Sequence, residues 1–343
     1  MKRFAKTVIL LSGLILLLAV CVLTIARFNP SNNYWLAFVA NPGERNEIFR
    51  VRSDGTHLEQ LTDNTIEEFN PIWSPQGAWI AYLSVYYPGY NDLTIMRHDG
   101  TQSHHITERA APISDPLWLE NPGWIAYTGI QQSERRVFKM DVKTGTNVVL
   151  IHERLPVSLY SAPILSPDSE WVALRLQEEA STRLMVARND GSEMVLLAEN
   201  IDGKPSWSPD SQWLTFASKW QIFRVRRDGS LLIPLTGVET VASSPAWSPD
   251  GKWIAFSTFG EMRWDIYKMQ PDGSNLQVIT NLPIAETDPD WSPEIGLPWN
   301  GWIMLAFLVG IIILRFVLTL TGTTGYIRLH LKPSISQWHM LPK

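Results

Sequence analysis

The chain has 343 residues, with 16 tryptophans, 23 prolines and one cysteine, and its formal net charge is −5. The length allows one large all-β domain or two ordinary domains. A negative net charge without a long basic run argues against a nucleic-acid partner. Because Cys21 is the only cysteine, an intrachain disulfide is excluded, and an extracytoplasmic domain has to be stable without one.

The first predicted element is an uncharged apolar run from Thr7 to Ala26. At 1.5 Å per residue it spans about 30 Å, the thickness of the hydrocarbon core of a bilayer. The run is longer than the apolar core of a usual signal peptide, and no A-x-A-like cleavage site follows it. We therefore expect a transmembrane helix over residues 7–27, with a cleaved signal peptide as the alternative. The basic residues before it favour a cytoplasmic location for residues 1–6.

Two short motifs recur through the middle of the chain. One reads tryptophan, an aliphatic residue, a small residue and an apolar residue, and it predicts a second strand in each repeat. The other places a large apolar residue two positions after a proline, predicts a first strand, and returns every 40–47 residues, the period of a four-stranded propeller blade. The first motif begins at Trp35, Trp79, Trp124, Trp171, Trp213 and Trp253, and the second is centred on Trp73, Trp118, Leu165, Trp207, Trp247 and Trp291.

The most complete unit, Pro245–Thr280, indicates how each repeat folds. It holds four short apolar runs, separated by turn residues such as Ser248-Pro249-Asp250-Gly251 and Asp272-Gly273. Four strands of this kind look like one propeller blade, which cannot bury both of its faces alone. In two copies a serine, Ser169 or Ser211, occupies the turn position where glycine costs least, so we expect modest backbone strain there.

The two motif series are out of phase. Trp35 has no first-strand motif before it, and Trp291 has no second-strand motif after it. We therefore expect Asp288–Pro293 to return to the start of the domain and form the innermost strand of the blade that begins at Tyr34. The sequence thus predicts an all-β, six-bladed β-propeller over residues 34–293, closed by a C-terminal inner strand.

A second apolar run, Trp302 to Thr321, follows the repeats. A tryptophan at its start suits a membrane interface, and its single charge, Arg315, lies within snorkelling reach of its far end. We expect a transmembrane helix over residues 302–321, with a helix packed on the propeller as the alternative. The tail, residues 322–343, has basic but no acidic residues, which favours the cytoplasm. The propeller is then on the extracytoplasmic side of the cell membrane.

The complete repeat reads Pro-x-Trp-Ser-Pro-Asp-Gly-x-Trp-Ile-Ala-Phe, followed by Ile-Tyr and Asp-Gly-Ser, and it resembles the TolB-type propeller repeat. Related repeats occur in the propellers of prolyl oligopeptidase and dipeptidyl peptidase IV relatives. The resemblance covers Tyr34 to Pro293 and implies the fold more strongly than a function, because such propellers serve many roles.

Two departures from these families matter. TolB itself is a soluble periplasmic protein with an α/β domain before its propeller, whereas only Arg27–Asn33 separates the first apolar run from the repeats here. The peptidases carry a hydrolase domain with a Gly-x-Ser-x-Gly motif, which this sequence lacks. The resemblance therefore implies neither a role in the Tol system nor peptidase activity.

Residue types that carry chemistry indicate no catalytic or metal site. No two histidines have the i, i+4 spacing of a zinc site, and His104 and His105 fall on a predicted outer strand, where neighbours point to opposite faces. The repeated Asp-Gly pairs are explained by turn chemistry, since calcium needs roughly six to eight converging oxygens. We expect no enzyme activity, no metal and no cofactor. Within the repeats, Trp220 and Trp264 alone among the tryptophans lie off the motifs, around the turns between second and third strands.

The repeats differ most at the residue before each first-strand proline. We expect this position where the inter-blade loops enter the central channel, and propellers usually bind partners at such a mouth. The set is mixed and leans acidic, which suits a polar or cationic ligand or a basic peptide segment. The candidate binding residues are Asn70, Asp115, Lys204, Ser244 and Asp288.

These features together predict a membrane-anchored, extracytoplasmic propeller that acts as a protein-interaction or scaffolding module in the cell envelope. One alternative is a sensor that binds a small molecule or glycan at the channel mouth. A propeller-type hydrolase is a further alternative, which the absence of histidine from the mouth positions disfavours.

Overall fold

The computed structural model describes residues 34–86, 89–107, 114–119, 123–131, 134–149, 158–159, 163–178, 181–190, 192–260 and 262–293. Within these ranges the chain forms 25 strands and no helix. The predicted transmembrane helices, residues 7–27 and 302–321, lie outside the described residues, as do the predicted tails 1–6 and 322–343. Among the residues that the structure describes, no helix has the length and apolar character needed to cross a membrane.

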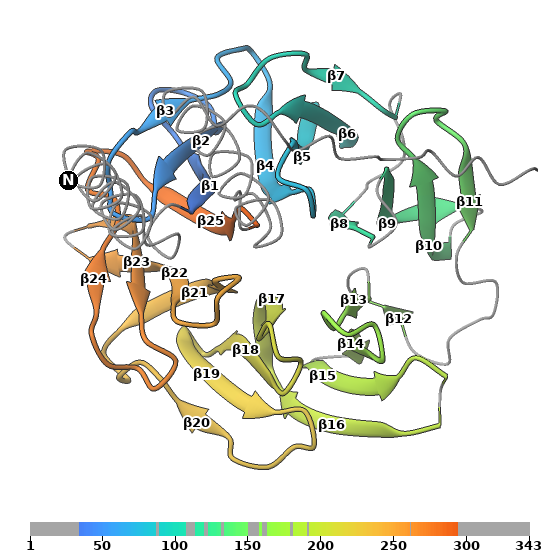
Figure 1. Cartoon of the computed structure of the whole chain (residues 1–343), viewed down its shortest axis with the longest axis vertical. Helices are drawn as coiled ribbons and strands as arrows, with labels where there is room; N and C mark the ends of the chain where they lie inside the picture. The colour runs from blue at the N-terminus through green and yellow to red at the C-terminus, as the bar shows by residue number, and fades with distance from the viewer. Residues whose placement is uncertain are drawn as a thin grey trace, which may run out of the picture. The chain divides into compact units, whose positions relative to one another are not determined.

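The strands form six antiparallel sheets, which are arranged as blades around a central axis (Figure 1). The predicted all-β, six-bladed propeller is therefore confirmed. Blade 1 contains β25 (Glu286–Trp291), β1 (Trp35–Ala40), β2 (Glu47–Arg52) and β3 (Glu59–Gln60). Blade 2 contains β4 (Glu67–Trp73), β5 (Trp79–Tyr86), β6 (Tyr90–Arg97) and β7 (His104–His105), and blade 3 contains β8 (Ser114–Trp118), β9 (Trp124–Gln131), β10 (Glu134–Asp141) and β11 (Asn147–Val149).

The second half of the ring repeats this order, with one exception in blade 4. There the innermost position is split between two short strands, which both pair with the same neighbour. Blade 4 contains β12 (Ser158–Leu159), β13 (Ile164–Leu165), β14 (Trp171–Glu178), β15 (Ser181–Arg188) and β16 (Met194–Glu199). Blade 5 contains β17 (Ile201–Trp207), β18 (Trp213–Ser218), β19 (Gln221–Arg226) and β20 (Ile233–Pro234), and blade 6 contains β21 (Val241–Trp247), β22 (Ile254–Gly260), β23 (Arg263–Met269) and β24 (Gln277–Val278).

The ring closes in blade 1, where the end of the domain pairs with its beginning. β25 runs antiparallel to β1, with Trp291 opposite Leu36 and Glu286 opposite Ala40. Ser292 extends the pairing, because its Oγ accepts a hydrogen bond from the Trp35 N–H at 2.9 Å and its own N–H donates to the Trp35 carbonyl at 2.7 Å. This pairing leaves no open strand edge between the first and last blades. The out-of-phase motifs predict this closure of the ring.

Both faces of β1 are covered by neighbouring blades. In β1, Leu36 and Phe38 belong to a core shared with blade 6, whereas Trp35 and Ala37 belong to a core shared with blade 2. Side chains of a strand alternate between its faces, so a strand buried on both sides has to be apolar at successive positions. Equivalent cores lie between blades 2 and 3, 4 and 5, and 5 and 6.

The Asp-Gly turns join the third and fourth strands and also touch the preceding blade. Gly273 has a φ of 85°, and a Cβ atom there would lie 2.8 Å from the carbonyl oxygen of Leu235 in blade 5. Glycine is therefore required both for the backbone conformation and for the close approach. The two serines with expected strain, Ser169 and Ser211, do adopt left-handed conformations, with φ of 57° and 58°.

Candidate functional site

The innermost strands share a bulge at the dipeptide formed by proline and the residue before it. In blade 2, Asn70 and Pro71 together lie opposite Tyr82, because Phe69 pairs with Leu83 and Ile72 pairs with Ala81. Proline cannot donate to the ladder, and a bulge is one of the few places where a strand accepts it. The same kind of register shift occurs in blades 1, 3, 5 and 6.

The observed position of the candidate residues, within this bulge, differs from the predicted one. They were expected in loops ahead of the first strands, but they lie within the innermost strands themselves, for example Asn70 in β4, Ser244 in β21 and Asp288 in β25. These three residues have left-handed backbones, with φ of 51°, 52° and 55°. Residues other than glycine adopt this conformation at an energetic cost, which is found most often at functional sites.

Blades 3 and 5 place their candidates at the same level of the ring. Asp115 lies in the bulge of β8. In β17 the bulge is one residue longer, Gly203 takes the left-handed conformation with a φ of 70°, and Lys204 follows it. All five predicted candidates therefore lie on innermost strands, one in each of five blades.

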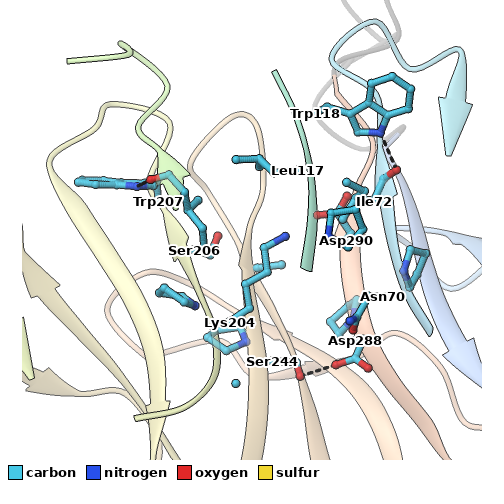
Figure 2. A pocket seen from close by; sticks show the side chains of 18 of the residues that line it. Asn70, Ile72, Leu117, Trp118, Lys204, Ser206, Trp207, Ser244, Asp288 and Asp290 are labelled. Carbon is cyan, nitrogen blue, oxygen red and sulfur yellow. Dashed lines mark hydrogen bonds between the residues drawn. The ribbon is translucent and has the colours of Figure 1, made fainter. Parts of the chain in front are cut away.

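The innermost strands enclose one cavity of about 430 Å³, which is lined by residues from all six blades. Four of the predicted residues line it, namely Asn70, Lys204, Ser244 and Asp288, and Pro116 next to Asp115 lines it as well. Figure 2 shows the Lys204 side chain extending from β17 into the space beside Asp290. Residues far apart in the sequence are thus brought together by the ring alone.

Asp288 is held at the cavity wall by blade 6. Its Oδ1 accepts a hydrogen bond of 2.7 Å from the Ser244 hydroxyl, as Figure 2 shows, and its backbone N–H donates to the Ser257 hydroxyl at 3.2 Å. Each bond crosses from β25 to a strand of the neighbouring blade. The carboxylate is therefore oriented by the junction between blades 6 and 1.

Asp290 is a second cavity carboxylate, which the sequence prediction missed. Its Oδ2 accepts a hydrogen bond of 2.9 Å from the backbone N–H of Trp73 in blade 2. Burial raises the pKa of Asp290 to about 6, while the nearby Lys204 ammonium and the Trp73 bond act in the opposite direction. A signal was available, because Asp290 is the one charged residue between proline and the motif centre; the other copies have Ile72, Leu117, Ile164, Ser206 and Ala246.

Arg175, also missed, brings a cation to the cavity from the opposite side of the ring. It lies on β14, where it is buried, and it lines the cavity. It is the fifth residue of its second-strand motif, and it too breaks the repeat, since the equivalent residues are Val39, Leu83, Thr128, Ala217 and Ser257. The wall thus carries carboxylates on blade 1 and cations on blades 4 and 5.

The residue between proline and the motif centre also joins neighbouring blades. At Ile72, Ile164 and Ala246, the backbone carbonyl accepts a hydrogen bond from the indole Nε1 of the next blade. Where the residue is polar, as at Ser206 and Asp290, its side chain instead accepts the backbone N–H of the next tryptophan, Trp247 or Trp73. Asp290 therefore combines a structural bond with a place on the cavity wall.

The histidines and the turn carboxylates considered as metal ligands lie at separate places in the described residues. No group of three or more His, Cys, Asp or Glu residues there could hold a metal ion. His104 and His105 are exposed on β7, as expected for an outer strand. The carboxylates of the Asp-Gly turns are engaged within their own turns; the Asp54 Oδ1, for example, accepts the Thr56 N–H at 3.0 Å.

Solved structures share this fold at low sequence identity. TolB from Acinetobacter baumannii matches with a TM-score of 0.62 and 16% identity, over 76% of this chain and 67% of that one. A protein assigned as TolB from Agrobacterium tumefaciens matches with a TM-score of 0.58 and 18% identity, over 74% and 91% of the two chains. A chain of a nidogen–laminin complex gives a TM-score of 0.58 at 10% identity, over 76% and 99%.

The sequence itself matches the model of the TolB beta propeller domain over residues 85–297. This range is more than half of the chain and includes the repeats of blades 3 to 6. The repeat motifs, the six blades and this match agree. The chain therefore belongs to the TolB beta propeller domain family.

Proposed function

We propose that this protein is a membrane-anchored interaction module that binds a segment of a partner protein in the central channel of its propeller. The cavity carries the proposal, because Asn70, Lys204, Ser244 and Asp288 line it from four different blades. A propeller that needed only a stable ring could repeat one residue at this position, as it does at the packing positions. Variation at this position of the inner wall favours recognition.

The charges of the cavity suit a segment with polar or charged side chains. The carboxylates of Asp288 and Asp290 belong to blade 1, and the cations of Lys204 and Arg175 belong to blades 5 and 4. Electrostatic complementarity would orient a bound segment, with its cationic groups toward blade 1. The bulge prolines add apolar wall without N–H donors, so the few polar groups determine what is recognised.

Anchoring by the two apolar runs, residues 7–27 and 302–321, completes the proposed arrangement. The first and last described residues of the propeller are close together, since Trp35 and Ser292 exchange hydrogen bonds. Both connections therefore leave blade 1 at one place, which is compatible with two neighbouring transmembrane helices. In this arrangement both termini are cytoplasmic and the propeller is extracytoplasmic.

A small polar molecule is the second candidate ligand, and the size of the cavity favours it. A volume of about 430 Å³ lies within the range of small-molecule sites, roughly 300–1,000 Å³. A thermal-shift screen of the full chain against polar metabolites and oligosaccharides tests this candidate. A hit whose effect survives Asp288→Asn and Lys204→Ala would not be a channel ligand.

Site-specific photo-crosslinking in membranes of the native host tests the proposed partner. A photoreactive amino acid replaces Lys204 in the channel or, as the control, Met194 on the outer strand β16, whose side chain is 60% exposed. We expect discrete protein adducts from position 204 that are absent from position 194. Equal adducts at both positions, or none at position 204, would contradict a channel that binds protein.

A reporter fusion tests the anchoring separately. Alkaline phosphatase or a fluorescent protein fused after Lys343 reports the side of the membrane on which the C-terminus lies. We expect the cytoplasmic signal. An extracytoplasmic signal would rule out the arrangement with two membrane crossings and both ends in the cytoplasm.

A further inference from the structure

Exposed aromatic side chains gather on the hairpins of blades 5 and 6, outside the channel. Trp220, at the turn between β18 and β19, is 54% exposed, and Phe259, near the end of β22, is 45% exposed. Trp264 on β23 joins them, since its ring centroid lies 6.1 Å from that of Trp220 and 5.7 Å from that of Phe259. We call Trp220, Phe259 and Trp264 the hairpin cluster.

The turn that presents Trp220 has an unfavourable backbone. Lys219 and Trp220 form a two-residue hairpin turn in which both have a left-handed conformation, with φ of 50° and 64°. Asn-Gly or another glycine-containing pair is the usual choice for such a turn. A glycine at position 220 would relieve the strain, so the turn itself does not require the exposed indole. Strain of this kind is retained most often where a side chain has a function.

Two inner strands connect the hairpin cluster to residues of the channel wall. The Trp220 N–H contacts the Asp202 Oδ2 at 3.4 Å, and the Trp220 carbonyl accepts the Ala242 N–H at 2.7 Å. Asp202 and Ala242 each precede a cavity residue, Lys204 or Ser244, by two positions. At about 3.3 Å per strand residue, the cluster begins roughly 7 Å along these strands from the cavity wall.

The position of the cluster favours protein over lipid as its occupant. Strands alternate in direction, so the turns between second and third strands lie on one face of the ring. The ends of the propeller lie on the other face, because Ser292 pairs with Trp35 at the start of β1, whereas Ala285 bonds Asn41 just beyond its end. If the ends lead into the membrane, the hairpin cluster points away from that bilayer.

We propose that one extended segment of a partner protein occupies the cavity and the hairpin cluster together, with charged residues in the cavity and apolar residues on the aromatic rings. The inference rests on the proposed function, since it extends the channel ligand outward over blades 5 and 6. An extended chain rises about 3.3–3.6 Å per residue, so roughly two residues span the distance at which the two groups of contacts begin to separate.

Selection from a phage library of random linear peptides on the full chain in mild detergent provides the probe. Synthetic versions of the selected peptides are then measured by biolayer interferometry against the wild type, the channel variant Asp288→Asn, the cluster variant Trp220→Gly and the control Tyr90→Ser. Tyr90 is 48% exposed at the corresponding hairpin of blade 2. Asparagine and glycine both accept a left-handed backbone, so neither variant is expected to unfold the chain.

We expect the peptides to carry a charged residue about two or more positions from an apolar pair. We also expect both variants to weaken binding at least about tenfold, with no change for Tyr90→Ser. A loss of affinity with Asp288→Asn alone would contradict the shared segment but would agree with the proposed function. Loss with Trp220→Gly alone, or with neither variant, would overturn both. Equal loss with Tyr90→Ser would show non-specific adhesion to exposed aromatics and would also overturn the inference.

Discussion

The interfaces between blades and the wall of the channel use neighbouring strands but follow different rules. At the interfaces the same apolar motif returns, and Leu36, Ile80 and Ile254, equivalent residues of three blades, are all fully buried. On the channel wall, equivalent positions carry an amide, a hydroxyl, a carboxylate or an ammonium group. Packing a blade between two others requires constant apolar volume, whereas the channel wall has no such requirement. Repetition therefore identifies the scaffold, and departures from it identify the candidate site.

Removing an interface side chain should have the largest effect on stability. Phe38 is fully buried on β1 and stacks on Phe49 with ring centroids 5.8 Å apart. We expect Phe38→Ala to lower the free energy of unfolding by about 3–5 kcal/mol, because it leaves a cavity in the core between blades 1 and 6. Denaturant unfolding measures the loss. Leu276→Ala, at a side chain that is 58% exposed, is the control and should change stability by less than about 0.5 kcal/mol.

Disturbing the contact between a turn and the preceding blade should have the second-largest effect on stability. Gly273→Ala places a Cβ atom 2.8 Å from the Leu235 carbonyl oxygen at a φ of 85°. We expect a loss of about 2–3 kcal/mol from the strained backbone and the displaced blade contact. Gly43→Ala is the matched control, because nothing lies within 4 Å of its added Cβ. Equal stability of the two variants would show that the Asp-Gly turns do not hold the blades together.

Buried carboxyls at the junctions of blade 1 should make stability depend on pH. Burial raises the pKa of Glu68 and of Glu286 to about 7. The folded chain then binds more protons than the unfolded chain between the ordinary carboxyl pKa and about 7, so stability falls as pH rises through this window. We expect the free energy of unfolding to fall by about 2–3 kcal/mol from pH 6 to pH 8, measured by denaturant unfolding at each pH.

The variant Glu286→Gln separates this effect from other titrations. Glu286 is fully buried and accepts a hydrogen bond from the Thr280 hydroxyl of blade 6. Glutamine does not titrate, so the variant should show a smaller difference in stability between pH 6 and pH 8, whatever its absolute stability. An unchanged pH dependence would assign the proton uptake to other groups.

Changing the channel wall should have the smallest effect on stability and a clear effect on binding. Asp288→Asn keeps a side chain that tolerates a φ of 55° and can still accept the Ser244 hydroxyl. We expect a stability change below about 0.5 kcal/mol and an affinity loss of at least about tenfold for a channel ligand. Calorimetry measures the stability of the variant and its affinity for a selected peptide. A destabilisation as large as that of Phe38→Ala would place Asp288 in the scaffold.

The sequence by itself determined the fold, because the evidence for it is local and repeated. Each copy carries its own strand and turn residues, and the unpaired motifs at Trp35 and Trp291 were enough to predict closure of the ring. It also identified four residues that share the cavity, since they lie at one position of the repeat. It did not place them within the strands, because a bulge depends on the register with the neighbouring strand rather than on the residues alone.

Only the tertiary structure decided which side chains meet. Asp290 and Arg175 lie at different positions of their repeats and face one cavity because six blades surround it. The same holds for Trp220 and Trp264, which the sequence separates by a whole blade and the ring brings to 6.1 Å. A propeller blade is specified by neighbours in sequence, whereas the channel and the hairpin face are formed between blades, by contacts that no single repeat contains.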